Sequence, residues 1–152
     1  MGDSHTIIEG TVFQLLSPPP EGADADASQW GASVPVPVQL RFEVADPFAV
    51  HLRFTTGPTR DVRWVFAREL LTDGLLGPVG NGDVRVWPGE DPARDVVVVE
   101  LSSPTGPARF EASATAVATF LDRSFALVAP GRESERVDLD AALVALLTTD
   151  GR

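Results

Sequence analysis

The sequence predicts an α+β protein, with a mostly antiparallel sheet of about seven strands followed by C-terminal helices. Between residues 34 and 112, short segments of alternating apolar residues recur, and this period-two alternation is typical of half-buried strands. Apolar residues at helical spacing gather mainly after residue 113. Strands that come first and helices that come late favour α+β architecture over alternating strand–helix units.

A chain of 152 residues is expected to form a single domain over 1–152. The first strand is predicted over 5–16. One of its faces is expected to carry Ile7, Thr11, Phe13 and Leu15. The segment 17–33 is rich in proline, glycine, alanine and aspartate, which bury too little apolar surface to offset the entropy lost on ordering. We therefore expect a mobile loop there, and a frayed tail over 148–152.

The clearest strand pattern starts at residue 34. Six apolar residues alternate there without a break, namely Val34, Val36, Val38, Leu40, Phe42 and Val44. Pro35 and Pro37 have the other parity and leave one edge of the strand without N–H donors, so this end is expected at a sheet edge. Alternation resumes over 48–55 and 61–66, which predicts an antiparallel meander with one buried face.

The second half of the chain mixes helices and strands. A short helix is predicted over 67–75. Strands are predicted over 84–87, 95–102 and 108–112. The glycine-rich stretch 77–82 leads into a strand rather than into a helix N-terminus, so it is expected to be a hairpin-like connection and not a phosphate cradle. The run 96–99 does not alternate, which predicts burial on both faces.

Two helices are predicted to close the chain. The first lies around 114–128 and brings one set of residues onto a common stripe: Val117, Phe120, Leu121, Ser124 and Val128. The second has Asp138 as a candidate N-cap. Its apolar stripe is expected to contain Leu139, Ala142, Leu143, Leu146 and Leu147.

Composition excludes several kinds of chemistry. The chain has no cysteine and its 12 basic residues are all arginine, which excludes disulfides, thiolate metal sites, Schiff bases and a P-loop lysine. His5 and His51 are too few to build a zinc site without cysteine. No serine stands in the G-x-S-x-G motif that a triad with His51 would need. We therefore expect no metal, no cofactor and no catalytic residue.

Targeting signals are not evident in the sequence. The first residues contain no basic segment followed by an apolar stretch, as a signal peptide would. The apolar runs are far shorter than the about 20 residues that cross a membrane. We therefore expect a cytoplasmic protein with no direct membrane insertion.

One group of arginines is a candidate binding site. In an antiparallel pair, the numbers of facing residues have a constant sum. If this sum is about 94 between strands 34–44 and 48–55, and about 116 between strands 48–55 and 61–66, the open face of the meander carries three arginines side by side: Arg41, Arg53 and Arg63. Like charges opposite each other are destabilising, and Glu43 and Asp61 are placed to offset part of that repulsion. Two interpretations stay open: a solvated face with diagonal ion pairs, which contribute little, or a basic stripe that binds an acidic partner.

Arg85 and Trp87 form a second candidate. Val84 and Val86 share one parity, so Arg85 and Trp87 face the opposite way. An exposed tryptophan beside an arginine has the composition of an interface hot spot. The alternative for Trp87 is burial under a helix or in a contact between copies of the chain.

Several motifs, in order along the chain, resemble the SsgA-like proteins of sporulating actinobacteria. They are DPFAVHLRF (46–54), WVFARELL (64–71), GDVRVWP (82–88) and LSSPTG (101–106). Shorter matches follow in the same order: FL (120–121), APG (129–131) and DLD (138–140). The resemblance extends over about 34–147, which is roughly three quarters of the chain.

This resemblance implies a non-enzymatic regulator of sporulation-specific cell division. Such a protein marks septum sites in the cytoplasm, recruits the tubulin-like protein FtsZ and promotes its polymerisation through protein contacts. The resemblance also implies an SsgA-type family member as a further partner. The family fold is similar to that of whirly proteins, whose strongly bent, intertwined sheets form trimers, so a homotrimer is expected.

Whirly proteins bind single-stranded nucleic acid, which provides an alternative function by analogy of fold. Such binding depends on a positive groove lined with stacking aromatic residues. The net charge of −10 repels polyanions and argues against this alternative.

Overall fold

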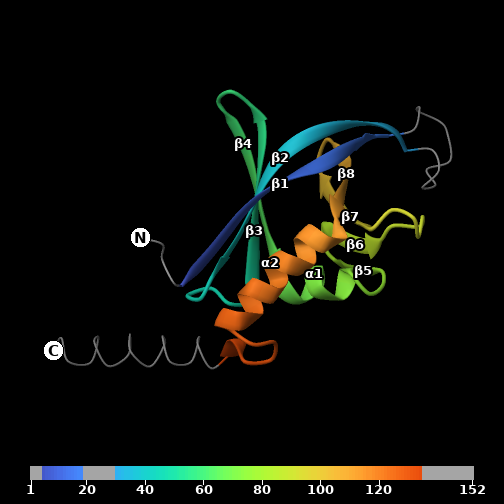
Figure 1. Ribbon diagram of the computed structural model, residues 1–152. Helices are drawn as coiled ribbons and strands as arrows, with labels where there is room; N and C mark the ends of the chain where they lie inside the picture. Colours follow the sequence, from blue (N-terminus) through green and yellow to red (C-terminus); the bar gives the residue numbers. More distant parts are fainter. Residues whose placement is uncertain (1–4, 19–29, 135–152) are drawn as a thin grey trace, which may run out of the picture.

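The computed structural model describes residues 5–18 and 30–134, and in these ranges eight strands form one antiparallel sheet that packs against two helices (Figure 1). The elements are β1 (Thr6–Ser17), β2 (Gly31–Glu43), β3 (Ala49–Gly57), β4 (Arg60–Ala67), α1 (Arg68–Gly74), β5 (Val79–Asn81), β6 (Val84–Pro88), β7 (Val96–Ser103), β8 (Gly106–Ser113) and α2 (Ala114–Leu127). The predicted α+β class is confirmed, with eight strands in place of about seven.

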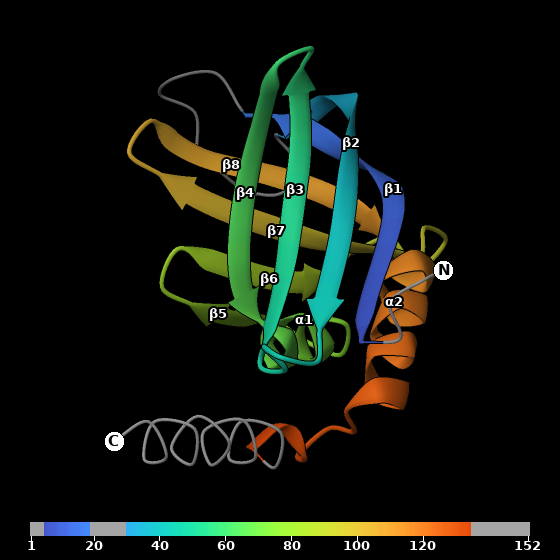
Figure 2. The same ribbon diagram turned by 90° about the vertical axis from the view of Figure 1, so that its left-hand side faces the viewer.

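The sheet consists of two four-stranded meanders. Its strand order is β4-β3-β2-β1-β8-β7-β6-β5, so the first four strands form one half and the last four form the other. β1 pairs with β2 along its whole length, whereas β1 and β8 share three residue pairs, between Gln14–Leu16 and Arg109–Glu111. Because this seam is narrow, the sheet bends there, and the strands of one half run across those of the other (Figure 2).

The core lies between the two halves of the sheet. Three phenylalanines meet in it, Phe13 of β1, Phe54 of β3 and Phe110 of β8, and all are buried. The rings of Phe54 and Phe110 stack with centroids 4.7 Å apart, and Phe13 meets Phe54 edge-on at 5.9 Å. Stacked and edge-on pairs are favourable at these separations. The three rings therefore join two half-sheets that share few backbone hydrogen bonds.

The helices cover different parts of the bent sheet. α1 packs against β4, β5 and β6, whereas α2 packs against β1, β7 and β8. α2 begins at Ser113, whose hydroxyl accepts a hydrogen bond from the Ala116 N–H at 3.1 Å. The predicted stripe of α2 is confirmed, because its members are all buried: Val117, Phe120, Leu121, Ser124 and Val128.

The additional strand lies in the glycine-rich stretch. Val79–Asn81 pairs with β6 in a hairpin, and Gly82 adopts a φ of +64° at the turn. Glycine reaches this left-handed region without steric cost. The expected hairpin-like connection is thus confirmed, with a regular strand before the turn.

Burial follows the predicted pattern with two corrections. In the run 96–99, which was predicted to be covered on both faces, Val97, Val98 and Val99 are buried and Val96 is half-buried. Val34 and Val62 were expected in the core, yet 56% and 43% of their surfaces are exposed. Both lie near the starts of β2 and β4, which project away from the helices (Figure 1), so the core does not reach them.

Pro35 and Pro37 lie at a free edge, as predicted. β2 pairs with β1 over this stretch, whereas within the described residues its pairing with β3 runs from Val38 to Arg41. The ends of the predicted loop 17–33 belong to β1 and β2, which pair up to Ser17 and Gly31. Most of that loop, the tail and the predicted helix after residue 138 lie outside the described residues.

Replacing Gly74 by alanine is expected to destabilise the fold. A Cβ at this position would lie 2.2 Å from Val86 Cγ1, so α1 would have to move away from β6. Overpacking of this kind costs about 1–3 kcal/mol of unfolding free energy, which exceeds the about 1 kcal/mol that alanine gains over glycine in a helix. Urea unfolding of the Gly74→Ala variant measures this loss.

Gly77→Ala is the matched control, because a Cβ there meets no atom within 4 Å. Its unfolding free energy is expected to stay within about 0.5 kcal/mol of the parent. Equal stability of the two variants would contradict the tight contact between α1 and β6.

Candidate protein-interaction surface

Charged side chains gather on the outer face of β2, β3 and β4, because the opposite face of these strands is buried in the core. Arg41, Arg53 and Arg63 come from the three strands and line one shallow depression of about 430 Å³. These three residues are called the outer arginine cluster below. The structure therefore brings together the three arginines that the strand parity had placed on one face.

The pairing of β2 with β3 differs by two residues from the expected register. Paired numbers sum to 92 rather than about 94, so Arg41 faces His51, and Arg53 faces Gln39. The reason is that the turn is centred on Asp46, whose N–H donates to Glu43 O at 3.0 Å. A shift of two residues keeps every side chain on its face, and Arg41 now lies diagonally from Arg53.

Between β3 and β4 the register is as predicted. Arg53 lies directly opposite Arg63, and paired numbers sum to 116. Like charges in this arrangement repel each other. Arg53 Nε lies 3.0 Å from Asp61 Oδ2, and Arg41 forms an ion pair with Glu43. These are the two carboxylates that were expected to offset the repulsion.

Arg63 differs from its two neighbours. It is exposed, and no ion pair to it occurs within residues 5–18 and 30–134. It also faces the guanidinium of Arg53 across the strand pair. The Arg63 guanidinium is therefore available to form an ion pair with a carboxylate of another molecule.

Exposed apolar residues flank the outer arginine cluster. Ile8 of β1 lies opposite Arg41, and Val65 of β4 lies opposite His51. About half of the surface of each is exposed, 49% for Ile8 and 54% for Val65. Apolar side chains beside arginine are typical of protein-binding surfaces.

Arg85 and Trp87 lie on the outer face of the other half-sheet. Arg85 is exposed, and Trp87 is half-buried, which lies between the exposed and the buried interpretations of this residue. The arginine over its ring is Arg109 of β8, at 5.0 Å from the ring centroid. Arg109 also lies 4.3 Å from the ring centroid of Trp30, and its Nη2 is 2.7 Å from Glu100 Oε2. Trp87 is thus covered by an intramolecular cation–π contact.

Sequence reasoning missed Arg109, Glu100 and Trp30. The tight turn between β7 and β8 pairs Ser103 with Gly106, and this register places Glu100 opposite Arg109. Strand parity around that turn could therefore have revealed the ion pair. Trp30 follows a segment without periodicity, so no local signal indicates where its ring packs.

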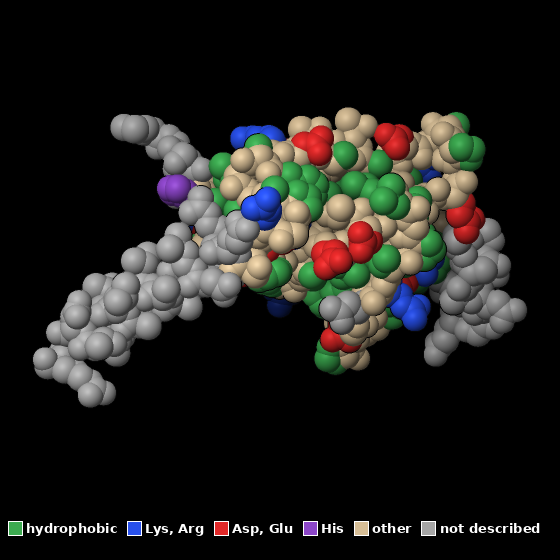
Figure 3. Space-filling model, turned by 90° about the horizontal axis from the view of Figure 1, so that it is seen from below, with side chains coloured by type: hydrophobic (Ala, Val, Ile, Leu, Met, Phe, Trp, Pro, Cys, Tyr) green, Lys and Arg blue, Asp and Glu red, His purple; other side chains and the backbone are tan. Residues whose placement is uncertain are grey.

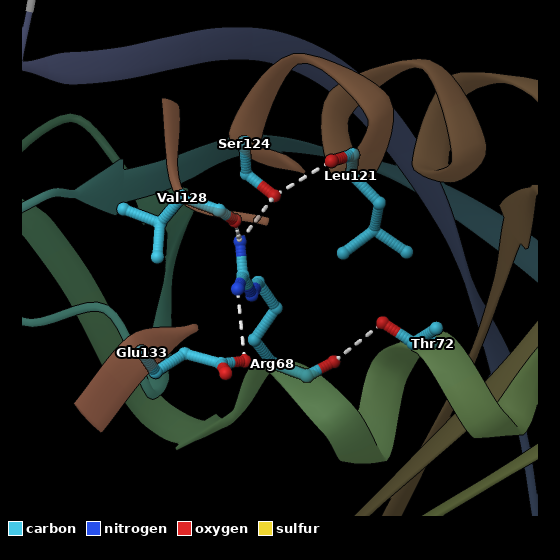
Figure 4. Close-up of polar contacts among 6 residues, drawn as sticks. All are labelled: Arg68, Thr72, Leu121, Ser124, Val128 and Glu133. Carbon is cyan, nitrogen blue, oxygen red and sulfur yellow. Dashed lines mark hydrogen bonds and ion pairs between the residues drawn. The ribbon is translucent and has the colours of Figure 1, made fainter. Parts of the chain in front are cut away.

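A buried arginine ties the start of α1 to the end of α2 (Figure 4). Arg68 is 1% exposed. Its Nη1 donates to Val128 O at 2.8 Å and to Ser124 Oγ at 3.3 Å, and its Nη2 lies 2.8 Å from Glu133 Oε2. A buried charge needs such partners to offset the loss of hydration. Sequence reasoning missed this contact too, because Glu133 lies 65 positions along the chain.

Two aromatic rings and one shifted carboxyl group complete the environment of Arg68. Its guanidinium lies 4.9 Å from the ring centroid of Phe42 and 4.8 Å from that of Phe125. Burial raises the pKa of Glu133, but the hydrogen bond and the charge of Arg68 lower it more, so the pKa lies below its ordinary value. The ion pair is therefore formed at neutral pH.

His51 lies 3.4 Å from Asp46 on the exposed outer face. Within the described ranges, no group of three histidine or acidic side chains could hold a metal ion. None of the helices described is both long and apolar enough to cross a membrane.

Comparison with known families identifies the fold. The family model described as Streptomyces sporulation and cell division protein, SsgA, matches residues 36–133. The chain belongs to the SsgA family. Sporulation-specific cell division protein SsgB of Streptomyces coelicolor is 51% identical over 116 residues, which cover 76% of this chain and 85% of that protein. SsgB of Saccharopolyspora erythraea is 46% identical over 151 residues, with 99% of each chain covered.

Solved structures of SsgA-family proteins share the fold. An SsgA-like sporulation-specific cell division protein from Thermobifida fusca matches with a TM-score of 0.80 at 38% identity, covering 95% of this chain and 98% of that one. A structure from work on SsgB mutations that correlate with longitudinal cell division in Streptomyces coelicolor matches with a TM-score of 0.74 at 41% identity, covering 90% and 99%. The resemblance inferred from the sequence motifs is therefore confirmed.

The ion pair between Arg68 and Glu133 is expected to make stability depend on acid pH. Because the pKa of Glu133 is lowered in the folded state, the pair stabilises fully above the unfolded value of about 4.3. This contribution is lost as the pH falls through the folded pKa. Urea unfolding of the parent and of Glu133→Gln, followed from neutral pH downward, is expected to show a stability gap that narrows in acid.

Arg68→Met/Glu133→Gln serves as the control, since it removes both charges and keeps an apolar chain in the core. At neutral pH its unfolding free energy is expected to differ from that of Arg68→Met, in which Glu133 is charged without its partner. This difference is expected to shrink at low pH, where Glu133 is protonated and resembles glutamine. A gap between the parent and Glu133→Gln that stayed constant down to acid pH would contradict the lowered pKa.

Proposed function

We propose that this SsgA-family protein is a non-enzymatic adaptor of sporulation-specific cell division, which marks septum sites, recruits FtsZ and promotes its polymerisation. Its relatives are named sporulation-specific cell division proteins. We further propose that the protein acts in the cytoplasm at the division septum and that an SsgA-type family member is one of its partners. The proposal also includes assembly of this chain into a homotrimer.

The outer arginine cluster is the observation that carries this proposal. In a chain of net charge −10, this open sheet face carries three arginines, two of which pair with Glu43 and Asp61. Arg63 has no ion-pair partner in the part of the chain described, and it faces Arg53. An acidic surface patch of FtsZ would relieve that repulsion, while Ile8 and Val65 would supply apolar contact.

Assembly would strengthen a weak contact of this kind. A homotrimer presents three copies of the outer arginine cluster. Binding of one copy to an FtsZ polymer raises the effective concentration of the others near neighbouring subunits. Promotion of polymerisation then follows from holding several subunits together, without any bond being made or broken.

Single-stranded nucleic acid fits the outer arginine cluster less well. Bases are held by stacking on aromatic rings between the phosphate contacts. The depression that contains the three arginines is lined by neither phenylalanine nor tryptophan. Trp30 and Trp87 lie elsewhere, and Arg109 already occupies a face of each ring.

Reversal of the outer arginine cluster is expected to weaken FtsZ binding. Arg41→Glu/Arg53→Glu/Arg63→Glu should reduce co-sedimentation with FtsZ polymers by at least about tenfold, since each lost charge contact adds repulsion to an acidic partner. The thermal unfolding midpoint is expected to change little, because all three residues are exposed. Light scattering of the purified parent and of the triple variant should give a molar mass three times that of one chain, because the proposed assembly is a homotrimer.

Arg60→Glu is a matched control for Arg63→Glu. Both arginines are exposed on β4, and neither has an ion pair within residues 5–18 and 30–134, yet Arg60 lies outside the cluster. Arg63→Glu should weaken pelleting while Arg60→Glu leaves it unchanged. Arg85→Glu tests whether the other half-sheet contributes. Unchanged pelleting by the triple variant would overturn the proposal, and salt-dependent retention of a labelled oligonucleotide would favour the alternative.

A further inference from the structure

A groove beside α1 shares no residue with the outer arginine cluster. It has a volume of about 460 Å³ and lies between the turn before β3, the start of α1 and the chain that follows α2. Phe48, Phe125 and Pro130 form its apolar walls. Phe48 is 51% exposed, so a large apolar ring is open to solvent at the rim.

The accessible charges of this groove are acidic. Arg68 lines it, but this guanidinium is 1% exposed and is already paired with Glu133. Glu69 and Asp73 lie one turn apart on α1 and therefore share a helix face. Both are exposed, and neither has an ion pair within the described residues. Arg132, although close in the chain, is not among the lining residues.

Acidic and apolar side chains lie next to each other on this side of the molecule (Figure 3). Arg68 Nε, which is buried without a hydrogen-bond partner in the described structure, is not accessible to a ligand in the groove. Carboxylates without an ion pair beside an exposed and a half-buried phenylalanine ring describe a site for a cationic, partly apolar segment rather than for a metal ion.

We propose that this groove binds a segment of a partner protein in which an arginine or lysine stands next to an aliphatic or aromatic residue. The cation pairs with Glu69 and Asp73, and the apolar side chain packs on Phe48 and Phe125. An arginine can in addition stack on the open face of Phe48. This inference concerns a second surface and does not depend on the proposed recruitment of FtsZ.

Charge distinguishes this occupant from the tail of the chain itself. Residues 135–152 contain four acidic residues and two arginines. The acidic residues are Glu135, Asp138, Asp140 and Asp150, and the arginines are Arg136 and Arg152. A segment with a net negative charge is repelled by Glu69 and Asp73. A cationic partner segment therefore fits the groove better than residues 135–152 do.

Fluorescence anisotropy with labelled peptides tests this inference on the full-length protein. The probe is a peptide in which leucine, arginine and alanine repeat in turn, and its counterpart has glutamate in place of arginine. Phe48→Ala and Glu69→Gln/Asp73→Asn are each expected to weaken binding of the arginine peptide by about fivefold or more. Added salt should weaken binding to the parent more than to the doubly neutralised variant.

Matched controls separate the groove from the general negative charge of the protein. Glu90→Gln/Asp122→Asn removes the same number of exposed carboxylates elsewhere, and Val65→Ala removes an exposed apolar side chain on the outer face. Both should change affinity by less than about twofold, the scatter expected for surface positions outside a binding site. The triple arginine variant should bind the peptide normally, so failure of the FtsZ proposal leaves this result unaffected.

Three results would overturn the inference. Equal losses in the groove variants and their controls would show non-specific attraction. Equal binding of the glutamate peptide, or of a peptide with the sequence of residues 135–152, would show that the charge of the segment does not matter. Peptide binding that disappears as the mass measured by light scattering rises would assign the groove to a second copy of this chain.

Discussion

The narrow seam between β1 and β8 is the constraint on which the rest of the structure depends. Three residue pairs connect the two half-sheets through the backbone, so side chains must hold the halves together. Phe13, Phe54 and Phe110 do this in the core, and α1 and α2 span strands on either side of the bend. Most apolar residues of the strands are thereby directed inward, and the opposite faces carry charged side chains together with a few exposed apolar ones such as Ile8 and Val65.

The outer arginine cluster and the groove beside α1 both follow from this division. Strands β2 to β4 have an outer face that no helix in the described part covers, and the arginines collect there. The groove forms instead where the bent sheet ends against α1 and α2, because Arg68 draws Glu133 and the chain around it towards the core. One chain of net charge −10 thus presents an arginine-bearing sheet face and an acidic groove at different places.

Local patterns were sufficient to predict most elements of this fold. Alternation and turn residues located seven of the strands and both described helices, because period and turn chemistry are encoded within a few neighbouring residues. The β2–β3 register was missed by two residues, since a turn centred on Asp46 competes with one centred on Pro47. Contacts such as Arg68 with Glu133 and Trp30 with Arg109 join distant segments, and no short-range pattern specifies them.

The stacking around Arg109 also has an optical consequence. The chain contains three tryptophans and no tyrosine. Trp30 and Trp87 both lie against the Arg109 guanidinium, while Trp64 packs at the margin of the core. The fluorescence of two of the three indoles therefore depends on one contact, which joins the residue preceding β2 to the second half-sheet. Intrinsic tryptophan fluorescence therefore reports whether the residue preceding β2 stays in contact with the second half-sheet.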